Sequence, residues 1–422
     1  MRQLPVLLAR RPRVRASNAL TLLAGIASFA LLAYVVLGVA HQIIAAPPAL
    51  RLVLVHDVPL PSGLGASSVG TSDPLAPGVA VPFDHFDFQA YDAQTHKLFI
   101  AHSGPNPDKL TLAHIPFDPA TDGHIIVFDT AQQRVIARVN IPHVTGIAVA
   151  PDLHKVYASD ADDNDVYVID ESALATKPIH LAKNDSPDAI SYDPDHHRIF
   201  VSAPGVPANP DKSANVDRKN QNVVVIDARS DRIVAKVKVG NMPKLSAEDV
   251  PTAEGTDIPA FGYAIGHSRY DGVQHRVFLV TQIRPDADNP NPNILAPPGT
   301  GELMAIDPVS AKVVRRVVLP ASCITPHGMA LDTEQEVAFI ACVDANPATG
   351  LPQNLVRIDL TTMSVIPSDP NQMRLATVPD IVVVDHTYHV VLVACREGIS
   401  VFDERPGAFH KLNDYHMGKN TH

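Results

Sequence analysis

The sequence predicts an all-β protein made of one repeated four-stranded unit, and three observations lead to this fold class. Six apolar runs of strand length each end on an aspartate. Each run follows a pair of strand-like segments joined by a tight turn, as in Asp188–Ala203. A polar turn and a fourth run follow, as in Arg232–Val239. The six aspartates are Asp129, Asp170, Asp227, Asp307, Asp359 and Asp403. A four-stranded sheet buries both faces only when copies stack around a centre, so the repeat predicts a β-propeller.

The repeats divide the chain into six predicted blades, with approximate limits 86–142, 143–184, 185–240, 260–320, 321–371 and 375–418. An isolated apolar run, Arg51–Val58, precedes them, and we expect it to join the last blade and close the ring, because closure hides sheet edges. The final residues, Gly418–His422, resemble the lead-in to another innermost strand. This pattern predicts an incomplete seventh blade and leaves three alternatives: a truncated chain, closure with six blades, or strands supplied by a second copy.

The N-terminal residues predict a single membrane-spanning helix. Residues 1–18 contain five arginines and no acid, which is typical of a cytoplasmic basic tail. Residues 19–46 contain no Asp, Glu, Lys or Arg, and about 20 apolar residues suffice to cross a membrane. A signal peptide cleaved after Ala40 is the alternative, but the apolar run exceeds the usual length of roughly 7–15 residues. We therefore expect an uncleaved signal anchor in the inner or plasma membrane, with the propeller domain, 49–422, on the periplasmic side.

The composition indicates a folded domain with a substantial core. Hydrophobic residues make up 45% of the chain and charged residues 19%. The formal net charge is −11 and there is no long run of Lys or Arg, so nucleic acid is disfavoured as a partner. The sequence lacks the C-x-x-C-H motif of attached haem, and we expect no cofactor.

Two longer segments carry a family resemblance. Asp188–Ala203 (DAISYDPDHHRIFVSA) and Asn222–Gly240 (NVVVIDARSDRIVAKVKVG) resemble the YVTN-type repeats of the YncE-like β-propeller family. Phe86–His102 and Pro326–Cys342 are similar to the blade openings of that family. The resemblance covers about Arg51–His422 and implies a seven-bladed, extracytoplasmic propeller. It supplies no general catalytic motif.

The long connections are expected to lie on one face. Antiparallel order places the start of each first strand, the end of each second strand and the second-to-third connections at the same edge of a blade. The five long connections are His102–Gly123, Pro204–Asn220, Asn241–Phe261, Gln282–Thr300 and Val343–Gln353. Because binding residues concentrate in loops on a rigid scaffold, this loop-rich face is the predicted binding face.

Alignment of the repeats predicts polar side chains around the channel mouth on that face. These residues suit a polar ligand or a metal ion, but none shows metal-ligand spacing along one element, and solvated strand ends would account for them equally well. We assign no metal ligand and no catalytic residue from the sequence. The candidate ligand-binding residues are Asp87, His102, Asp160, Asp188, His327, Asp380 and Arg396.

Residues Asp160–Asp165, followed by Glu171 at the twelfth position, imitate a calcium-binding loop. Asp165 stands where the calcium loop needs a glycine, and the next residues already form a predicted blade strand. An acidic hairpin is therefore the better interpretation. The paired histidines His196 and His197, like His96, lie in predicted turns and need no metal to explain them.

Three cysteines lie in the domain expected to be exported, where disulfides form. Cys323 and Cys342 flank the innermost hairpin of the fifth blade at the same face, so we predict a Cys323–Cys342 disulfide. The alternative pair is Cys342 and Cys395, which occupy equivalent positions in adjacent blades. A nucleophilic Cys395 with His327 as its base is a third interpretation, although thiols in strands more often serve packing.

Two functions from different classes fit these features. The first is a membrane-anchored, non-enzymatic scaffold that binds a ligand or protein through its loop-rich face. The second is a metal-dependent hydrolase of the lactonase kind, with its site at the propeller mouth. Metal content distinguishes the two.

Overall fold

The computed structural model describes the repeated part of the chain and little that precedes it. The described residues are 52–53, 72–73, 86–102, 123–161, 163–183, 185–204, 222–239, 265–282, 301–323, 325–343, 350–407 and 409–417. The chain divides into two units, Met1–Val55 and His56–His422. The predicted basic tail and membrane helix lie outside the described residues. Within the described part, no helix has the length and apolar character needed to cross a membrane.

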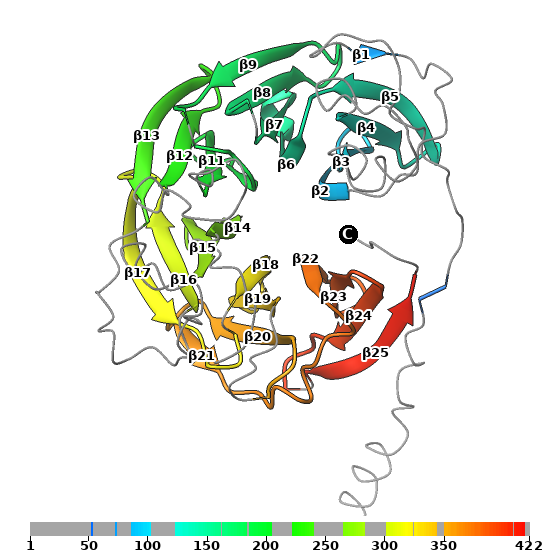
Figure 1. The fold of residues 1–422 in the computed structure, drawn as a ribbon, viewed down its shortest axis with the longest axis vertical. Coiled ribbons are helices and arrows are strands. Elements are labelled where there is room, and N and C mark those ends of the chain that lie inside the picture. Colours follow the sequence, from blue (N-terminus) through cyan, green and yellow to red (C-terminus); the bar gives the residue numbers. More distant parts are fainter. Residues whose placement is uncertain are drawn as a thin grey trace, which may run out of the picture. The chain divides into compact units, whose positions relative to one another are not determined.

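The described residues of the second unit form six antiparallel sheets, which are the six predicted blades (Figure 1). Each sheet of blades two to six has four strands in chain order, and blade one carries a fifth strand, β1, outside β5. The described residues therefore form an all-β propeller with the six blades that the repeats predicted. The incomplete seventh blade predicted from Gly418–His422 lies outside the described residues.

The strands of the first three blades follow the predicted limits closely. Blade one contains β1 (Ser72–Asp73), β2 (Phe86–Asp92), β3 (Lys97–His102), β4 (His124–Asp129) and β5 (Arg134–Asn140). Blade two contains β6 (Val144–Ala150), the short helix η1 (Pro151–Leu153), β7 (Lys155–Asp160), β8 (Asp165–Asp170) and β9 (Thr176–His180). Blade three contains β10 (Ile190–Asp193), β11 (Arg198–Ala203), β12 (Asn222–Asp227) and β13 (Arg232–Lys238).

The last three blades repeat the same order. Blade four contains β14 (Ile265–Asp271), β15 (Arg276–Gln282), β16 (Gly301–Asp307) and β17 (Lys312–Val318). Blade five contains β18 (Pro326–Asp332), β19 (Val337–Cys342), β20 (Asn354–Asp359) and β21 (Ser364–Ile366). Blade six contains β22 (Pro379–Asp385), β23 (Val390–Cys395), β24 (Gly398–Asp403) and β25 (His410–His416).

The aspartate that ends each third strand also starts the following turn. In blade three, the carboxylate of Asp227 accepts the backbone N–H of Ser230 at 2.8 Å, and Asp231 then adopts a left-handed conformation with φ 55°. Asp307 accepts the N–H of Ser310 in the same way at 2.8 Å. Asp and Asn stabilise turns by such side-chain to backbone hydrogen bonds. The repeated aspartate therefore serves the turn and not a ligand.

The core lies between blades. Each of the five buried apolar clusters joins two consecutive sheets, from blades one and two through to blades five and six. An aromatic residue at the third position of the second strand packs on the next blade in the first five blades. These residues are Phe99, Tyr157, Phe200, Phe278 and Phe339. The equivalent residue of blade six is Leu392, which is only half-buried.

The ring is continuous from blade one to blade six. Each innermost strand, β2, β6, β10, β14 and β18, packs against the next innermost strand. Among the described residues no contact of similar extent joins β22 to β2, and Figure 1 shows the sixth and first blades further apart than other neighbours. Leu52 and Val53 belong to no strand, and the remainder of the run predicted to close the ring lies outside the described residues, as does Gly418–His422.

Candidate functional site

A local irregularity in the innermost strands positions the side chains at the channel mouth. In β2, β6, β14, β18 and β22 the pairing with the second strand shifts register across the second and third residues. Such a bulge re-aims the side chains that it contains. The shift covers Asp87 in β2, His327 in β18 and Asp380 in β22, while Asp188 lies two residues before the start of β10. Four of the predicted site residues therefore lie where the innermost strands begin.

Three side chains from neighbouring blades form the centre of this region, which we call the mouth cluster: His267, His327 and Asp380. Asp380 Oδ1 lies 3.7 Å from His267 Nε2 and 3.7 Å from His327 Nδ1. The two imidazole rings meet edge to face with their centroids 4.9 Å apart. One ligand atom from each residue can be chosen so that all three lie within 4.8 Å of one another.

His267 was not predicted from the sequence. The alignment places His327 at the second residue of β18, and the equivalent second residue of β14 in blade four is Gly266. His267 is the third residue of β14, where blade five has Gly328. The bulge makes that third position face the channel as well. The sequence signal was a histidine next to a glycine at the start of a blade. Without knowledge of the bulge, this histidine cannot be assigned to the channel mouth.

The imidazole of His267 is fully buried, and neither ring nitrogen has a hydrogen-bond partner among the described residues. Burial, followed by the nearby charges of His327 and Arg269, holds its pKa well below the usual range, while Asp380 opposes that shift. The ring is therefore neutral, which is the form that binds a metal ion. A buried polar group without a partner costs roughly 1–3 kcal/mol, so these ring nitrogens are candidate donor atoms for a metal ion.

Two further carboxyl groups, Asp87 and Asp188, lie near enough to the cluster to interact with its charges. Burial and the charges of Asp188 and Asp380 raise the pKa of Asp87 well above its ordinary value. Burial raises the pKa of Asp188 to about 6, with His327 opposing and Asp380 reinforcing the shift. Like charges held together at low dielectric disfavour ionisation, and a bound cation would relieve this repulsion.

The mouth cluster has the donor set of a transition-metal site. Two imidazoles and one carboxylate form the protein ligands of many catalytic zinc sites, which leave a fourth position open. Ligand atoms of a tetrahedral site with bonds of about 2.0–2.2 Å lie about 3.3–3.6 Å apart. The observed separations of 3.7 Å between Asp380 and each histidine need only small side-chain adjustments.

The other three predicted residues lie outside the mouth cluster. His102 and Asp160 end second strands, one strand further from the channel, and both are buried. The ring of His102 contacts that of His124, with centroids 4.7 Å apart. Asp160 accepts the backbone N–H of Asp163 at 3.2 Å, and Arg396 is an exposed turn residue.

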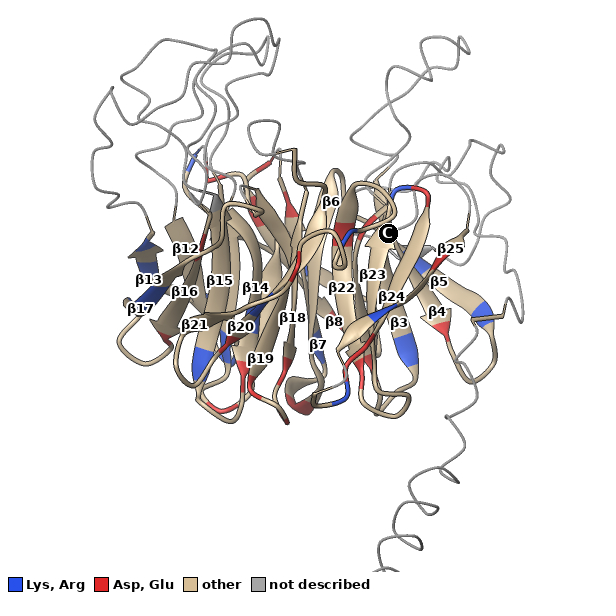
Figure 2. Cartoon of the chain, turned by 90° about the horizontal axis from the view of Figure 1, so that it is seen from below, with Lys and Arg blue, Asp and Glu red and all other residues tan. Residues whose placement is uncertain are grey.

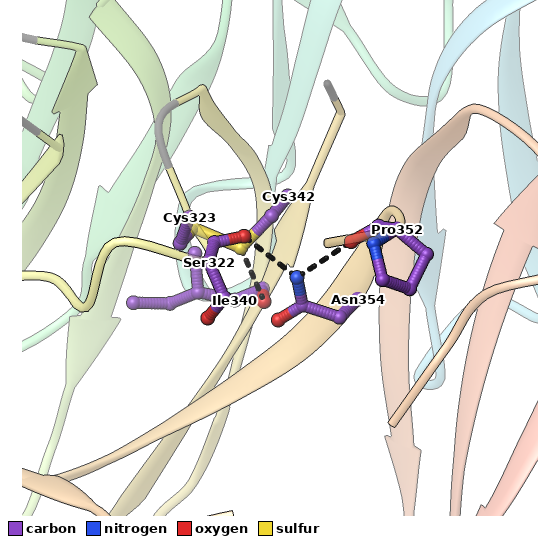
Figure 3. The surroundings of a disulfide bond; sticks show 6 residues. All are labelled: Ser322, Cys323, Ile340, Cys342, Pro352 and Asn354. Carbon is purple, nitrogen blue, oxygen red and sulfur yellow. Dashed lines mark hydrogen bonds between the residues drawn. A yellow bond between two sulfur atoms is a disulfide. The ribbon is translucent and has the colours of Figure 1, made fainter. Parts of the chain in front are cut away.

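The predicted disulfide between Cys323 and Cys342 is present, with the Cα atoms 5.1 Å apart (Figure 3). Beside it, the side-chain amide of Asn354 donates to the carbonyl of Ser322 at 2.6 Å. The alternative pairing with Cys395 is therefore wrong. Cys395 is a free, fully buried thiol in the apolar cluster between blades five and six, which favours a packing role over a nucleophilic one.

The calcium-like segment is a hairpin, as expected. Asp165 begins β8, and its carboxylate pairs with His180 at 2.8 Å. Glu171 turns away from this segment and contacts Thr95 and Lys97 of blade one. Asp160 and Asp165 are therefore paired ends of two strands of one blade hairpin, and Glu171 makes the contact between blades.

Most turn histidines are structural. In the first hairpins of several blades a histidine adopts a left-handed conformation, with φ 57° at His96, 50° at His197 and 53° at His275. His197 Nδ1 lies 3.0 Å from the hydroxyl of Tyr192. These turns form the edge opposite the mouth, where Figure 2 shows acidic and basic residues.

A second histidine–carboxylate group at that edge has its acids satisfied by protein donors. It comprises Asp332, His386 and Glu404. Gln335 donates backbone and side-chain N–H groups to Asp332, and its amide also contacts Glu404. Asp332 belongs to blade five and Glu404 follows β24 of blade six, so the group joins two blades.

The fold and the mouth cluster define a six-bladed β-propeller with polar groups converging at one end of its channel. No family model matches the sequence, and no curated protein matches it. Among solved structures, the chain is similar to Kuenenia stuttgartiensis hydrazine synthase, with a TM-score of 0.54 and 13% sequence identity over 77% of this chain and 78% of that chain. At this identity the similarity shows the fold alone.

Proposed function

We propose that this protein is a membrane-anchored, extracytoplasmic β-propeller that binds a ligand on its loop-rich face through a divalent transition-metal ion held by His267, His327 and Asp380. The observation that carries the proposal is the buried, neutral imidazole of His267, whose ring has no hydrogen-bond partner among the described residues and lies beside Asp380 and His327. The open fourth position of such a site would receive a donor atom of the ligand.

The location in this proposal rests on the sequence and on the disulfide. Residues 1–18 and 19–46 have the basic and apolar character of a signal anchor with a cytoplasmic tail. A disulfide is typical of proteins in oxidising compartments, which supports a propeller on the periplasmic side. Membership of the YncE-like family, with a seventh blade completed by further strands, is part of the same proposal and rests on the repeat pattern.

Metal analysis of the full-length chain in detergent tests the proposal. After incubation with zinc and gel filtration, we expect about one metal ion per chain, removed by EDTA. The His327→Ala variant should lose it, because a two-ligand site binds far more weakly. His386→Ala is the matched control, since His386 also lies between two carboxylates, and it should retain the metal. Equal metal content in wild type and His327→Ala would contradict the proposal.

A hydrolase is the second candidate, and the carboxyl of Asp188 beside the cluster favours it, because a zinc-bound water next to a carboxylate can attack an ester. Release of acid from a simple lactone by the zinc-loaded protein distinguishes the two functions. Activity that Asp188→Asn abolishes while the metal stays bound indicates a hydrolase. Metal binding without any hydrolysis indicates a binding module.

A further inference from the structure

The channel has a second chamber at the end opposite the mouth cluster. A cavity of about 710 Å³ opens among the innermost strands of blades one to four and the first hairpin turns. Its lining includes Phe88, Ile147, Ile190, Tyr192 and Arg269. Cavities of about 300–1,000 Å³ with mostly apolar walls and a few polar groups are typical ligand sites.

Phe88 and Arg269 lie between this chamber and the mouth cluster. The ring of Phe88 packs against His267 with centroids 4.4 Å apart, and the guanidinium carbon of Arg269 lies 5.8 Å from the centroid of Phe88. At the same strand position as Arg269, blades one, two, three and five carry only small residues, which are Ala90, Ala148, Ser191 and Ala330. The arginine therefore has room to reach into the chamber.

Among the residues that the structure describes, no acid pairs with the positive charge of Arg269. Its one hydrogen bond among the described residues is to the carbonyl of the preceding residue, Ser268, at 2.9 Å. Burial lowers the pKa of Arg269 to about 10, and no carboxylate offsets that effect. The acid in the lining, Asp152, is held at the rim by Tyr192 at 2.7 Å and by His197 at 3.0 Å. Enclosed arginines normally pair with an anion.

We propose that this chamber, which we call the Arg269 chamber, binds a small organic carboxylate whose anionic group pairs with the guanidinium of Arg269 and whose apolar part lies against Phe88, Ile147 and Ile190. A planar carboxylate matches the forked donors of arginine, and the apolar walls select a ligand with a hydrocarbon or aromatic body. This site is separate from the mouth cluster and does not require a metal ion.

Calorimetric titration of the full-length chain with benzoate tests the assignment, using benzamide as a neutral ligand of the same shape. The protein is treated with EDTA first, so that any binding at the mouth metal is eliminated. We expect benzoate to bind and benzamide to bind at least about tenfold more weakly, because a charge-assisted pair is lost. Failure of metal binding at the mouth would leave this result unchanged, so the two proposals fail separately.

The variant Arg269→Met should weaken benzoate binding at least about tenfold while keeping the volume of the side chain. Arg276→Met is the matched control, because Arg276 lies on the next strand, where it pairs with Asp307 at 3.0 Å. If Arg269→Met does not fold, the variant Arg269→Lys is used. Lysine keeps the positive charge but lacks the two parallel N–H donors of the guanidinium, so it should still weaken benzoate binding. Undetectable benzoate binding, equal binding of benzamide, or unchanged binding by the Arg269 variants would overturn the proposal.

Discussion

At the residue scale, the mouth depends on close contact between neighbouring innermost strands. A Cβ atom added to Gly328 would lie 1.7 Å from the carbonyl oxygen of Asp380, and one added to Gly146 would lie 2.1 Å from that of Asp188. No side chain fits at such distances without movement of the backbone. Glycine at these positions lets the carboxylate-bearing residues of the next blade approach the channel.

Gly328→Ala should therefore displace Asp380 and weaken zinc binding at least about tenfold, since one ligand leaves its place. Gly272→Ala is the control, because an added Cβ there would meet only the Tyr270 ring at 3.9 Å. Zinc competition with a fluorescent chelator measures both. Unchanged affinity in Gly328→Ala would show that Asp380 is not held by this contact.

The turn aspartates give a pH dependence with a defined sign. Hydrogen bonds from Ser230 hold the pKa of Asp227 below its ordinary value, and those from Ser310 do the same for Asp307. A lowered pKa contributes stability that is present above the unfolded pKa of about 3.9 and lost as pH falls through the folded value. Asp227→Asn should be less stable than wild type at pH 7, with the difference shrinking below about pH 3.9. Urea unfolding at pH 7 and pH 3 measures it, and a difference that grows in acid would contradict this account.

At the element scale, each blade covers its predecessor. Phe339 of blade five is 2% exposed and packs against blade six, whereas Leu392, its equivalent in blade six, is half-buried. Ala394 and Ile399 beside it are half-buried as well. The face of blade six that carries Leu392 therefore contributes less to the core than the equivalent face of blade five, which packs against blade six.

Phe339→Ala should destabilise the propeller by about 3–5 kcal/mol, the usual cost of removing a buried phenylalanine. Leu392→Ala should cost clearly less than the roughly 2–5 kcal/mol of a fully buried leucine. Chemical denaturation of the two variants compares them. An equal loss would mean that another part of the chain covers Leu392 fully in solution.

The sequence was sufficient to predict the blades because each one repeats the same apolar runs and turn aspartates. It also predicted the disulfide, since antiparallel order brings Cys323 and Cys342 to one edge, but only the structure excluded the alternative pair of Cys342 and Cys395. Two of the three residues of the mouth cluster were predictable. Asp380 and His327 followed from the alignment of the repeats. The bulge that places His267 at the channel has no sequence signal of its own. The sequence also does not show that Arg269 lacks an acidic partner among the described residues.

At the scale of the whole molecule, six blades surround a channel with two chemically different ends. The mouth cluster, which we propose as a metal site, places two imidazoles and a carboxylate where the innermost strands begin, and the Arg269 chamber presents a cation at the opposite end. The rings of Phe88 and His267, tilted by 50° to each other, lie between them. Each end is built from innermost strands of several blades, so both depend on the complete ring.

The most direct test of the metal proposal is anomalous diffraction at the zinc edge from crystals of the zinc-loaded protein. We expect one strong peak about 2.0–2.2 Å from a ring nitrogen of His267, a ring nitrogen of His327 and a carboxylate oxygen of Asp380. A peak only at the turn histidines, or none between these three side chains, would contradict it.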